Sequence, residues 1–303
     1  MKRALVFLAI TFGITYAYDF LVVYPIAQGT APYASEFLSP DLVPQLRAET
    51  SAMATIAALV RCGVVGPLLF VIAGAVVYFL AFPDDFDPNM TSFFAAQREA
   101  AAASGADGAT LAAVDASAAN PPLFALILLG QCAIAPALNL VTTFGEEWGW
   151  RGYLMPKLAT RLSIVPTMLV TGIIWGLWHA PVVALGHNYG TGYPGEPFGG
   201  IAAMCAWCTV LAIFLSYVTI RTGSTFAAAI GHGAVNGTTN GVTLFSLSGG
   251  NPFVGPLCTG IVGGLPLLVV AAAMLWNMRR REKAGTLHIP EAGLPDGMRR
   301  SRR

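Results

Sequence analysis

Two adjacent glutamates, Glu146 and Glu147, interrupt one of the most apolar parts of the sequence. A charged side chain within a membrane segment costs roughly 2.5–3.5 kcal/mol on insertion scales, so such a pair needs a partner or a function. In a helix, Arg151 lies one turn beyond Glu147 and is expected to pair with it. Glu146 is then the carboxylate available for chemistry. The alternative for this stretch alone is a solvated charge cluster just outside the bilayer.

Two histidines and an asparagine lie in other apolar runs. His179 is near the end of one run, and His232 lies in another with Asn236 four residues later, on the same helical face. Singly, a histidine in a membrane helix is more often a packing residue with a hydrogen-bond partner than a catalyst. Together these residues suit hydrolysis: a carboxylate activates water, imidazoles bind a metal or polarise a carbonyl, and an amide stabilises an oxyanion. We expect one polar cavity within the bilayer to collect four side chains: Glu146, His179, His232 and Asn236.

The composition indicates the environment in which these residues lie. Of the 303 residues 55% are hydrophobic and 11% are charged, with a mean hydropathy of +0.63, whereas about 25% of a soluble domain is charged. The chain is therefore expected to lie in a lipid bilayer, and a net charge of +1 gives no indication of nucleic-acid binding. His187 and His288 are expected to be solvated. The five cysteines lie in apolar runs, which predicts buried thiols rather than disulfides: Cys62, Cys132, Cys205, Cys208 and Cys258.

The predicted fold follows from the apolar runs in the sequence. A membrane span needs about 20 apolar residues, and several runs have about this length. They cover about residues 4–26, 52–82, 122–146, 164–186, 200–220, 224–247 and 257–278. The sequence predicts an all-α polytopic membrane helix bundle of about seven transmembrane helices, with eight possible. The first run contains Asp19 and precedes no small-residue cleavage pattern, so we interpret it as a retained helix rather than a signal peptide. Arg61, inside the second run, is expected to form an ion pair or to face the bundle interior.

The domain organisation follows from the same runs. Residues 1–278 are expected to form a single transmembrane domain, with an extramembrane, Ala-rich and partly helical insertion at 83–121 and a disordered basic tail at 279–303. Most Lys and Arg residues fall on the side of the tail, which places the C-terminus in the cytoplasm; Lys2 and Arg3 count against this orientation. The expected location is a plasma membrane of bacterial type.

Glycines and a proline bear on how the motif-bearing helices pack and end. Glycines four residues apart permit close approach of another helix, and they occur as two pairs, Gly145 with Gly149 and Gly172 with Gly176. The helix that carries the glutamates is expected to continue to about Met155, because Pro156 is the next residue that disfavours a helix.

Three stretches carry a resemblance to a known family. The sequence reads E-E-x-x-x-R from Glu146 to Arg151, aromatic-x-x-x-His from Trp175 to His179, and H-x-x-x-N from His232 to Asn236. In this order they resemble the motifs of the CAAX-protease and bacteriocin-processing family of intramembrane proteases, which includes the Ras-converting CAAX prenyl endopeptidases. The resemblance covers about residues 142–240. Trp175 is a departure, because phenylalanine is more usual there.

The resemblance implies an intramembrane endopeptidase that acts on peptide or protein substrates at the membrane, including prenylated ones. It implies that Glu146 activates the attacking water and that Asn236 helps to hold the oxyanion. The histidines His179 and His232 would complete the centre, and Glu147 and Arg151 would have supporting roles. One form of such a centre contains a divalent metal such as zinc, with three candidate ligands, Glu146, His179 and His232. The other uses a glutamate-activated water without a metal, and the sequence spacing does not choose between them.

Two other functions compete with proteolysis. In a proton-coupled transporter the same carboxylates and imidazoles, with Arg61, would form a proton relay, but the hydropathy pattern shows no inverted repeat. A non-catalytic self-immunity or assembly protein of the same fold is the second alternative, and the presence of every motif residue argues against it. The sequence contains no H-E-x-x-H, G-x-S-x-G or Walker A motif, which excludes the corresponding soluble-type hydrolase and nucleotide sites.

Overall fold

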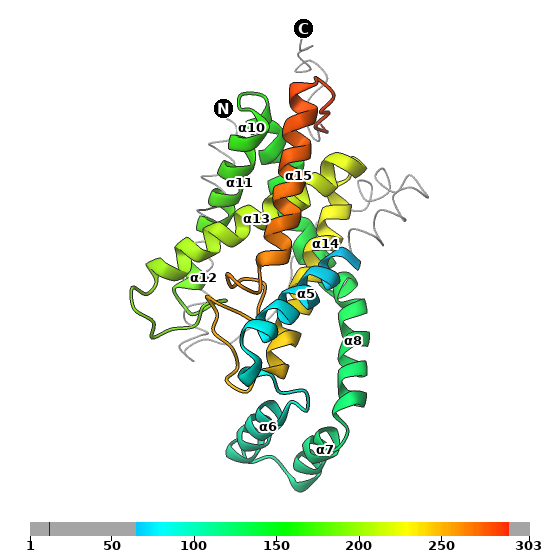
Figure 1. Ribbon diagram of the computed structural model, residues 1–303, viewed down its shortest axis with the longest axis vertical. Coiled ribbons are helices and arrows are strands. Elements are labelled where there is room, and N and C mark those ends of the chain that lie inside the picture. Colours follow the sequence, from blue (N-terminus) through cyan, green and yellow to red (C-terminus); the bar gives the residue numbers. More distant parts are fainter. Residues whose placement is uncertain (1–11, 13–64, 291–303) are drawn as a thin grey trace. The chain divides into compact units, whose positions relative to one another are not determined.

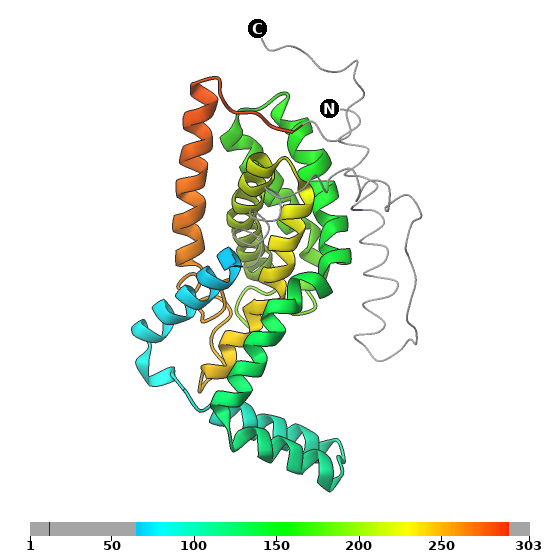
Figure 2. The same ribbon diagram turned by 90° about the vertical axis from the view of Figure 1, so that its right-hand side faces the viewer.

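The computed structural model describes residue 12 and residues 65–290 (Figures 1 and 2). Within that part every regular element is helical, and β-structure is limited to two isolated bridges, Phe86 with Ser246 and Asn251 with Gly255. The all-α prediction is therefore confirmed for the described residues. The predicted span 4–26 apart from residue 12, Arg61, and the end of the chain beyond residue 290 lie outside them.

Internal contacts divide the chain into two units. The first unit comprises Met1–Leu59, Phe144–Ala229 and Val270–Arg303, and the second comprises Val60–Thr143 and Ile230–Val269. The division falls within three helices, α9 (Leu140–Glu147), α14 (Thr225–Thr238) and α15 (Leu265–Lys283). Each unit is described by itself below.

Two described helices are long and apolar enough to cross a membrane, α8 (Pro121–Leu138) and α13 (Phe198–Thr222). Two shorter helices, α5 (Gly66–Ala81) and α11 (Ile164–Trp178), are also apolar, with 16 and 15 residues. A helix rises 1.5 Å per residue, so these two are shorter than the roughly 30 Å hydrocarbon core. Membrane spanning is thus supported for two helices, and the number of seven spans stays a prediction.

In the first unit, α11 packs closely against α13 through the predicted pair of glycines. A Cβ atom added to Gly172 would lie 2.3 Å from the Cα of Thr209, and one added to Gly176 would lie 2.4 Å from the Cα of Cys205. Any larger side chain would force the two backbones apart, so the predicted close approach is confirmed here. At Gly145, a Cβ would meet no atom of the described residues within 4 Å, so the close approach predicted there is not found among them.

The helix that carries the glutamates does not end at Met155, so that prediction is wrong. After α9 the chain continues as a π-helical stretch, Trp148–Leu154, and then as α10, Met155–Ala159. The N–H of Met155 bonds the carbonyl of Trp150, five residues earlier. Pro156 thus lies in the first turn of α10, where its missing N–H is not needed and its fixed φ suits a helix.

Two other predicted runs have different helix boundaries. The run 122–146 is divided at Asn139 into α8 and α9, and Pro136 lies inside α8, three residues before the division. The run 257–278 is helical only from Leu265, because a glycine-rich loop precedes it. Gly255 in this loop has φ 151°, and a Cβ on Gly263 would lie 2.2 Å from a backbone oxygen, so the loop requires glycine at both positions.

The C-terminal helix α15 continues to Lys283, beyond residue 279 where the tail was expected to begin. Met278 joins a buried cluster with Met155, Ile164 and residues of α11 and α13 in the same unit. One turn later, the backbone N–H of Ile164, the first residue of α11, donates to Oε1 of Glu282 over 2.8 Å. The end of α15 therefore satisfies one of the open donors at the start of α11.

In the second unit, the predicted insertion 83–121 contains two helices that lie side by side in Figures 1 and 2. These are α6 (Thr91–Ala103) and α7 (Gly108–Ala118). Asp107 caps α7 by accepting a 2.8 Å hydrogen bond from the backbone N–H of Thr110. An exposed ion pair of 2.9 Å joins Arg98 of α6 to Asp115 of α7.

Asp85 joins the chain just after α5 to a loop far along the sequence, within the second unit. Its carboxylate accepts hydrogen bonds from the hydroxyl of Tyr78 over 3.0 Å and the hydroxyl of Ser246 over 2.6 Å. It also accepts one from the backbone N–H of Ser248 over 2.8 Å. Burial opposes ionisation of Asp85, and these hydrogen bonds outweigh it, so the pKa of Asp85 lies below its ordinary value of 3.8.

We expect Asp85→Asn to lower the thermal unfolding midpoint at pH 7 and to reduce its dependence on acid pH. A lowered pKa means that the ionised carboxylate stabilises the fold above its ordinary pKa, and that this contribution is lost as the pH falls through the lowered pKa. The midpoint measured from pH 7 to pH 3 tests this. Asp84→Asn, at an exposed neighbouring position, should follow the wild-type curve. Identical curves for Asp85→Asn and wild type would contradict the prediction.

Candidate active site

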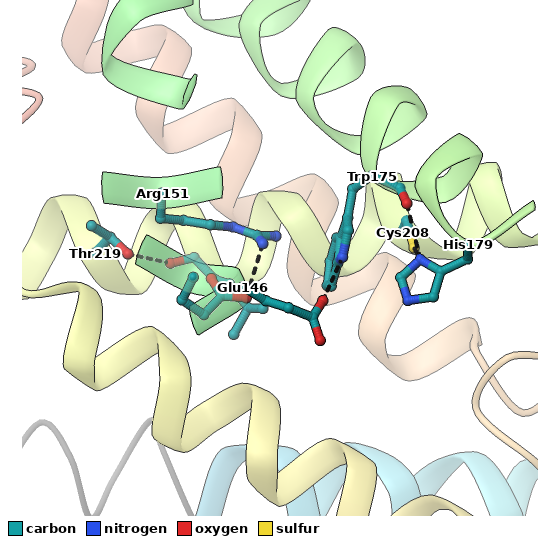
Figure 3. Close-up of polar contacts among 8 residues, drawn as sticks. Glu146, Arg151, Trp175, His179, Cys208 and Thr219 are labelled. Atoms are coloured by element: carbon teal, nitrogen blue, oxygen red, sulfur yellow. Dashed lines mark hydrogen bonds and ion pairs between the residues drawn. The ribbon is translucent and has the colours of Figure 1, made fainter. Parts of the chain in front are cut away.

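An indole holds the carboxylate of Glu146, the residue predicted to activate water. Nε1 of Trp175 donates a hydrogen bond of 2.9 Å to Oε2 of Glu146 (Figure 3). Trp175 lies on α11 with 1% of its surface exposed, and Glu146, near the end of α9, is partly exposed. A hydrogen bond to an ionised acceptor is stronger and shorter than one between neutral groups. The buried indole can therefore fix the orientation of a carboxylate that water reaches.

His179 follows directly after α11, one turn beyond Trp175. Its Nδ1 lies 2.9 Å from the backbone carbonyl oxygen of Trp175 and 4.0 Å from Sγ of Cys208 on α13. A carbonyl oxygen only accepts, so the neutral imidazole carries its proton on Nδ1 and keeps a lone pair on Nε2. This arrangement suits a base, a hydrogen-bond acceptor or a metal ligand.

Trp175 therefore contacts both residues predicted to do chemistry in this unit. Its side chain binds Glu146, its carbonyl oxygen lies against His179, and the Trp175 and His179 rings have centroids 5.9 Å apart. Figure 3 shows the indole between the carboxylate and the imidazole. The spacing of base and imidazole thus depends on one residue of α11.

The pairing of Glu147 with Arg151, predicted from their spacing, is confirmed. Nη1 of Arg151 lies 2.9 Å from Oε1 of Glu147, and both side chains are 0% exposed. The guanidinium carbon of Arg151 lies 4.3 Å from the ring centroid of Trp175, within the range of a cation–π contact. The pair neutralises a buried charge and places a cation on the face of the indole that binds Glu146.

His232 and Asn236 lie on α14 in the second unit. His232 is 4% exposed, whereas Asn236 one turn later is exposed. Gly237 packs against α8, since a Cβ added to it would lie 2.0 Å from the Cβ of Ala135. The structure thus brings Glu146 and His179 together in one unit, with His232 and Asn236 in the other. That all four converge on one cavity stays a prediction.

A bound metal was one of the two forms of the predicted centre. A catalytic zinc ion takes three protein ligands, and the residues that the structure describes contain no group of three His, Cys, Asp or Glu side chains that suits one. Glu146 and His179 alone make an incomplete set. His232 lies in the other unit, and zinc bound by Glu146, His179 and His232 stays a prediction from the resemblance.

Two contacts of the site were not predicted. The sequence analysis considered Trp175 only as an aromatic residue in place of the more usual phenylalanine. The indole N–H, which phenylalanine lacks, could have indicated a hydrogen bond to a carboxylate. His187 is exposed as expected, but its ring stacks on His179 with centroids 6.1 Å apart and planes 4° apart. Glycine and asparagine residues with positive φ on either side of His187 turn the chain back to make this contact: Gly186 at 96° and Asn188 at 63°.

Comparisons with known proteins agree with the motif pattern. Residues 124–238 match the family model described as type II CAAX prenyl endopeptidase Rce1-like. A stretch of 52 residues is 42% identical to CAAX prenyl protease 2 of Methanococcus maripaludis. This match covers 17% of the chain and 19% of that relative, so the chain spans about a fifth of the relative's length in it. No solved structure matches the chain.

The matched residues contain all three motifs, from Glu146 to Asn236. They also contain the contact between Glu146 and Trp175 and the buried pair of Glu147 with Arg151. The family consists of integral membrane proteases, in agreement with the apolar helices α8 and α13. The resemblance inferred from the motifs is thus confirmed: residues 124–238, which carry all three motifs, match the Rce1-like model of type II CAAX prenyl endopeptidases.

Proposed function

We propose that this chain is an intramembrane endopeptidase that hydrolyses peptide bonds of membrane-associated peptide or protein substrates. The observation that carries the proposal is the placement of Glu146 and His179 on either side of one tryptophan, Trp175, within the segment that matches the protease family. A partly exposed carboxylate beside an imidazole that is held through its Nδ1 is an arrangement suited to moving the protons of a water molecule.

In the proposed reaction Glu146 is the general base. It takes a proton from water as the water oxygen bonds to the carbonyl carbon of the scissile peptide. The developing oxyanion is held by donors, a role that we assign to the amide of Asn236 and to His232. His179 accepts a hydrogen bond from the water through Nε2 and orients it. The proton then passes from Glu146 to the leaving nitrogen as the carbon–nitrogen bond breaks.

The substrate class is proposed from the family. The matched relative is named a CAAX prenyl protease, so we assign to this chain peptides that carry a prenylated cysteine near their C-terminus. A prenyl group partitions into the bilayer by about 0.8 kcal/mol per buried CH₂. Such a chain would hold the scissile bond at the membrane, where the motif-bearing helices are expected to lie.

The activity is tested with purified protein in lipid nanodiscs and a fluorogenic peptide that ends in a CAAX sequence, prenylated or not. We expect cleavage of the prenylated peptide and little cleavage of the other. Incubation with a metal chelator separates the two forms of the centre, since only a metal-dependent one loses activity. Proton flux into liposomes without cleavage would favour the transporter, and neither activity would favour an assembly protein.

We further propose the arrangement in the membrane that the sequence predicts. This is a bundle of about seven spans, with eight possible, in a plasma membrane of bacterial type with the C-terminus in the cytoplasm. Two observations support it. α8 and α13 are long and apolar enough to span, and α15 ends in a basic turn that contains Arg280, Arg281 and Lys283, as expected for a cytoplasmic end.

The orientation predicts that the turn after α10 faces the cytoplasm. Thr160 in this turn is exposed, and we expect a cysteine at this position, in a chain whose own cysteines are replaced, to react with a membrane-impermeant maleimide only in inside-out vesicles. A cysteine at Ser104, exposed after α6, is expected to react from the opposite side. Labelling of Thr160→Cys in intact cells would contradict the orientation.

A further inference from the structure

The indole N–H of Trp175 is the hydrogen-bond donor to Glu146 in the candidate site. An indole can donate one hydrogen bond and accept none, and this one goes to Oε2 of Glu146 over 2.9 Å. With Trp175 1% exposed, bulk water does not compete for the donor. The carboxylate therefore gains a directional contact that a hydrocarbon ring could not provide.

The donor itself is held rigidly by its surroundings in the same unit. The guanidinium of Arg151, fixed by its ion pair with Glu147, lies 4.3 Å from the centroid of the indole. The backbone of α11 is held against α13 at Gly172 and Gly176, where no Cβ fits. A group whose own position is fixed by packing can fix its partner before substrate binds. The direction of the N–H is thus set by the fold.

We infer that Trp175 is a positioning residue that fixes one oxygen of Glu146 and thereby directs the other toward the attacking water. The inference rests on the proposed role of Glu146 as general base. Trp175 itself touches no reacting atom, and it acts through the carboxylate. Misplacement of a reacting group by about 1 Å can cost a hundredfold in rate. Loss of the N–H should therefore lower kcat strongly and change the affinity for substrate little.

The first test replaces Trp175 by phenylalanine, which keeps an aromatic ring and removes the donor. We expect kcat on the CAAX peptide to fall by about 10- to 100-fold, the range for loss of a hydrogen bond to a charged group, and KM to change by less than about twofold. Trp207→Phe is the matched control, because Trp207 is a buried tryptophan of α13 in the same unit with 9% exposure. Its kcat should stay within about twofold of wild type.

A second variant removes the donor at almost constant volume. Replacing Trp175 by 3-benzothienylalanine, in which sulfur takes the place of the indole N–H, keeps the ring that stacks on Arg151 and leaves no cavity. If Trp175→Phe folds poorly, this variant still decides the question. We expect the same fall in kcat. Wild-type kcat in folded protein with this residue would overturn the inference.

The third measurement does not depend on activity. In protein labelled with ¹⁵N at its tryptophans, the indole N–H signal of Trp175, assigned by its absence in Trp175→Phe, should shift when Glu146 is replaced by glutamine. A carboxylate deshields a bonded proton more than an amide does. An unchanged indole signal would show that the hydrogen bond does not form in the protein and would overturn the inference.

The outcomes separate this inference from the proposed function. If Glu146→Gln abolishes cleavage while both Trp175 variants keep wild-type kcat, Glu146 remains the base and the positioning role is refuted. If Glu146→Gln cleaves normally, the proposed function of Glu146 fails, whatever the indole signal shows. A fall in kcat at nearly unchanged KM for both Trp175 variants, together with a shift of the indole signal in Glu146→Gln, supports the positioning role.

Discussion

Replacing Glu146 by glutamine should lower the rate of peptide cleavage by at least about two orders of magnitude, the usual loss when a general base is removed. Glutamine has nearly the same size, and its amide oxygen can still accept the hydrogen bond from Trp175, but it cannot take a proton from water. The fold should therefore persist while catalysis is lost. Initial rates on a prenylated CAAX peptide measure the effect in protein whose unfolding midpoint matches wild type.

The control for this variant is Glu99→Gln, which removes an exposed carboxylate on α6 and should leave the rate within about twofold of wild type. The assignment of the two adjacent glutamates is tested at the same time. If Glu146→Gln stays active and well-folded Glu147→Gln is inactive, the roles of these residues have been assigned the wrong way round.

Breaking the buried pair of Glu147 with Arg151 should destabilise the protein by about 3–5 kcal/mol, because removal of one partner leaves a buried charge without compensation. Both side chains are 0% exposed, and their nitrogen and oxygen lie 2.9 Å apart. Glu147→Gln and Arg151→Met are each expected to lower yield and the unfolding midpoint in detergent. The double variant removes both charges and should cost less than the sum of the single variants.

A surface pair provides a matched control for the buried one. Arg98 and Asp115 have the same 2.9 Å separation, but their side chains are 54% and 53% exposed. Exposed pairs contribute roughly 0–1 kcal/mol, so Arg98→Met and Asp115→Asn should unfold nearly as wild type does. The assignment of a buried ion pair would be contradicted if the substitutions at positions 147 and 151 each destabilised the protein as little as these surface substitutions and if their effects on stability were additive.

The features that sequence analysis predicted correctly are local in the chain. The pairing of Glu147 with Arg151 follows from four-residue spacing in a helix, and the close approach of another helix at Gly172 and Gly176 follows from their spacing. The bond from Trp175 to Glu146 joins residues 29 positions apart. No periodicity encodes such a contact, since it depends on how α9 and α11 meet.

The predicted helix boundaries were wrong where the conformational properties of single residues, rather than the average hydropathy of the segment, determine where a helix begins or ends. The loop before Leu265 is as apolar as a span, yet Gly255 and Gly263 adopt backbone positions that no other residue fits. Pro156 is accommodated because the chain widens into a π-turn before it. A hydropathy window detects neither effect. His232 and Asn236, which lie in the second unit, remain linked to Glu146 by the motif pattern alone.

The bond from Ile164 to Glu282 has a practical consequence for how the protein is produced. The carboxylate that accepts a hydrogen bond at the start of α11, the helix that precedes His179, comes from near the end of the chain. A version shortened before residue 282, or one with a bulky fusion partner joined there, would lose this contact as well as the packing of Met278. Inactivity of such a preparation would then reflect an uncapped helix, so tags belong beyond Lys283 and apparent loss of function should first be checked on the untrimmed chain.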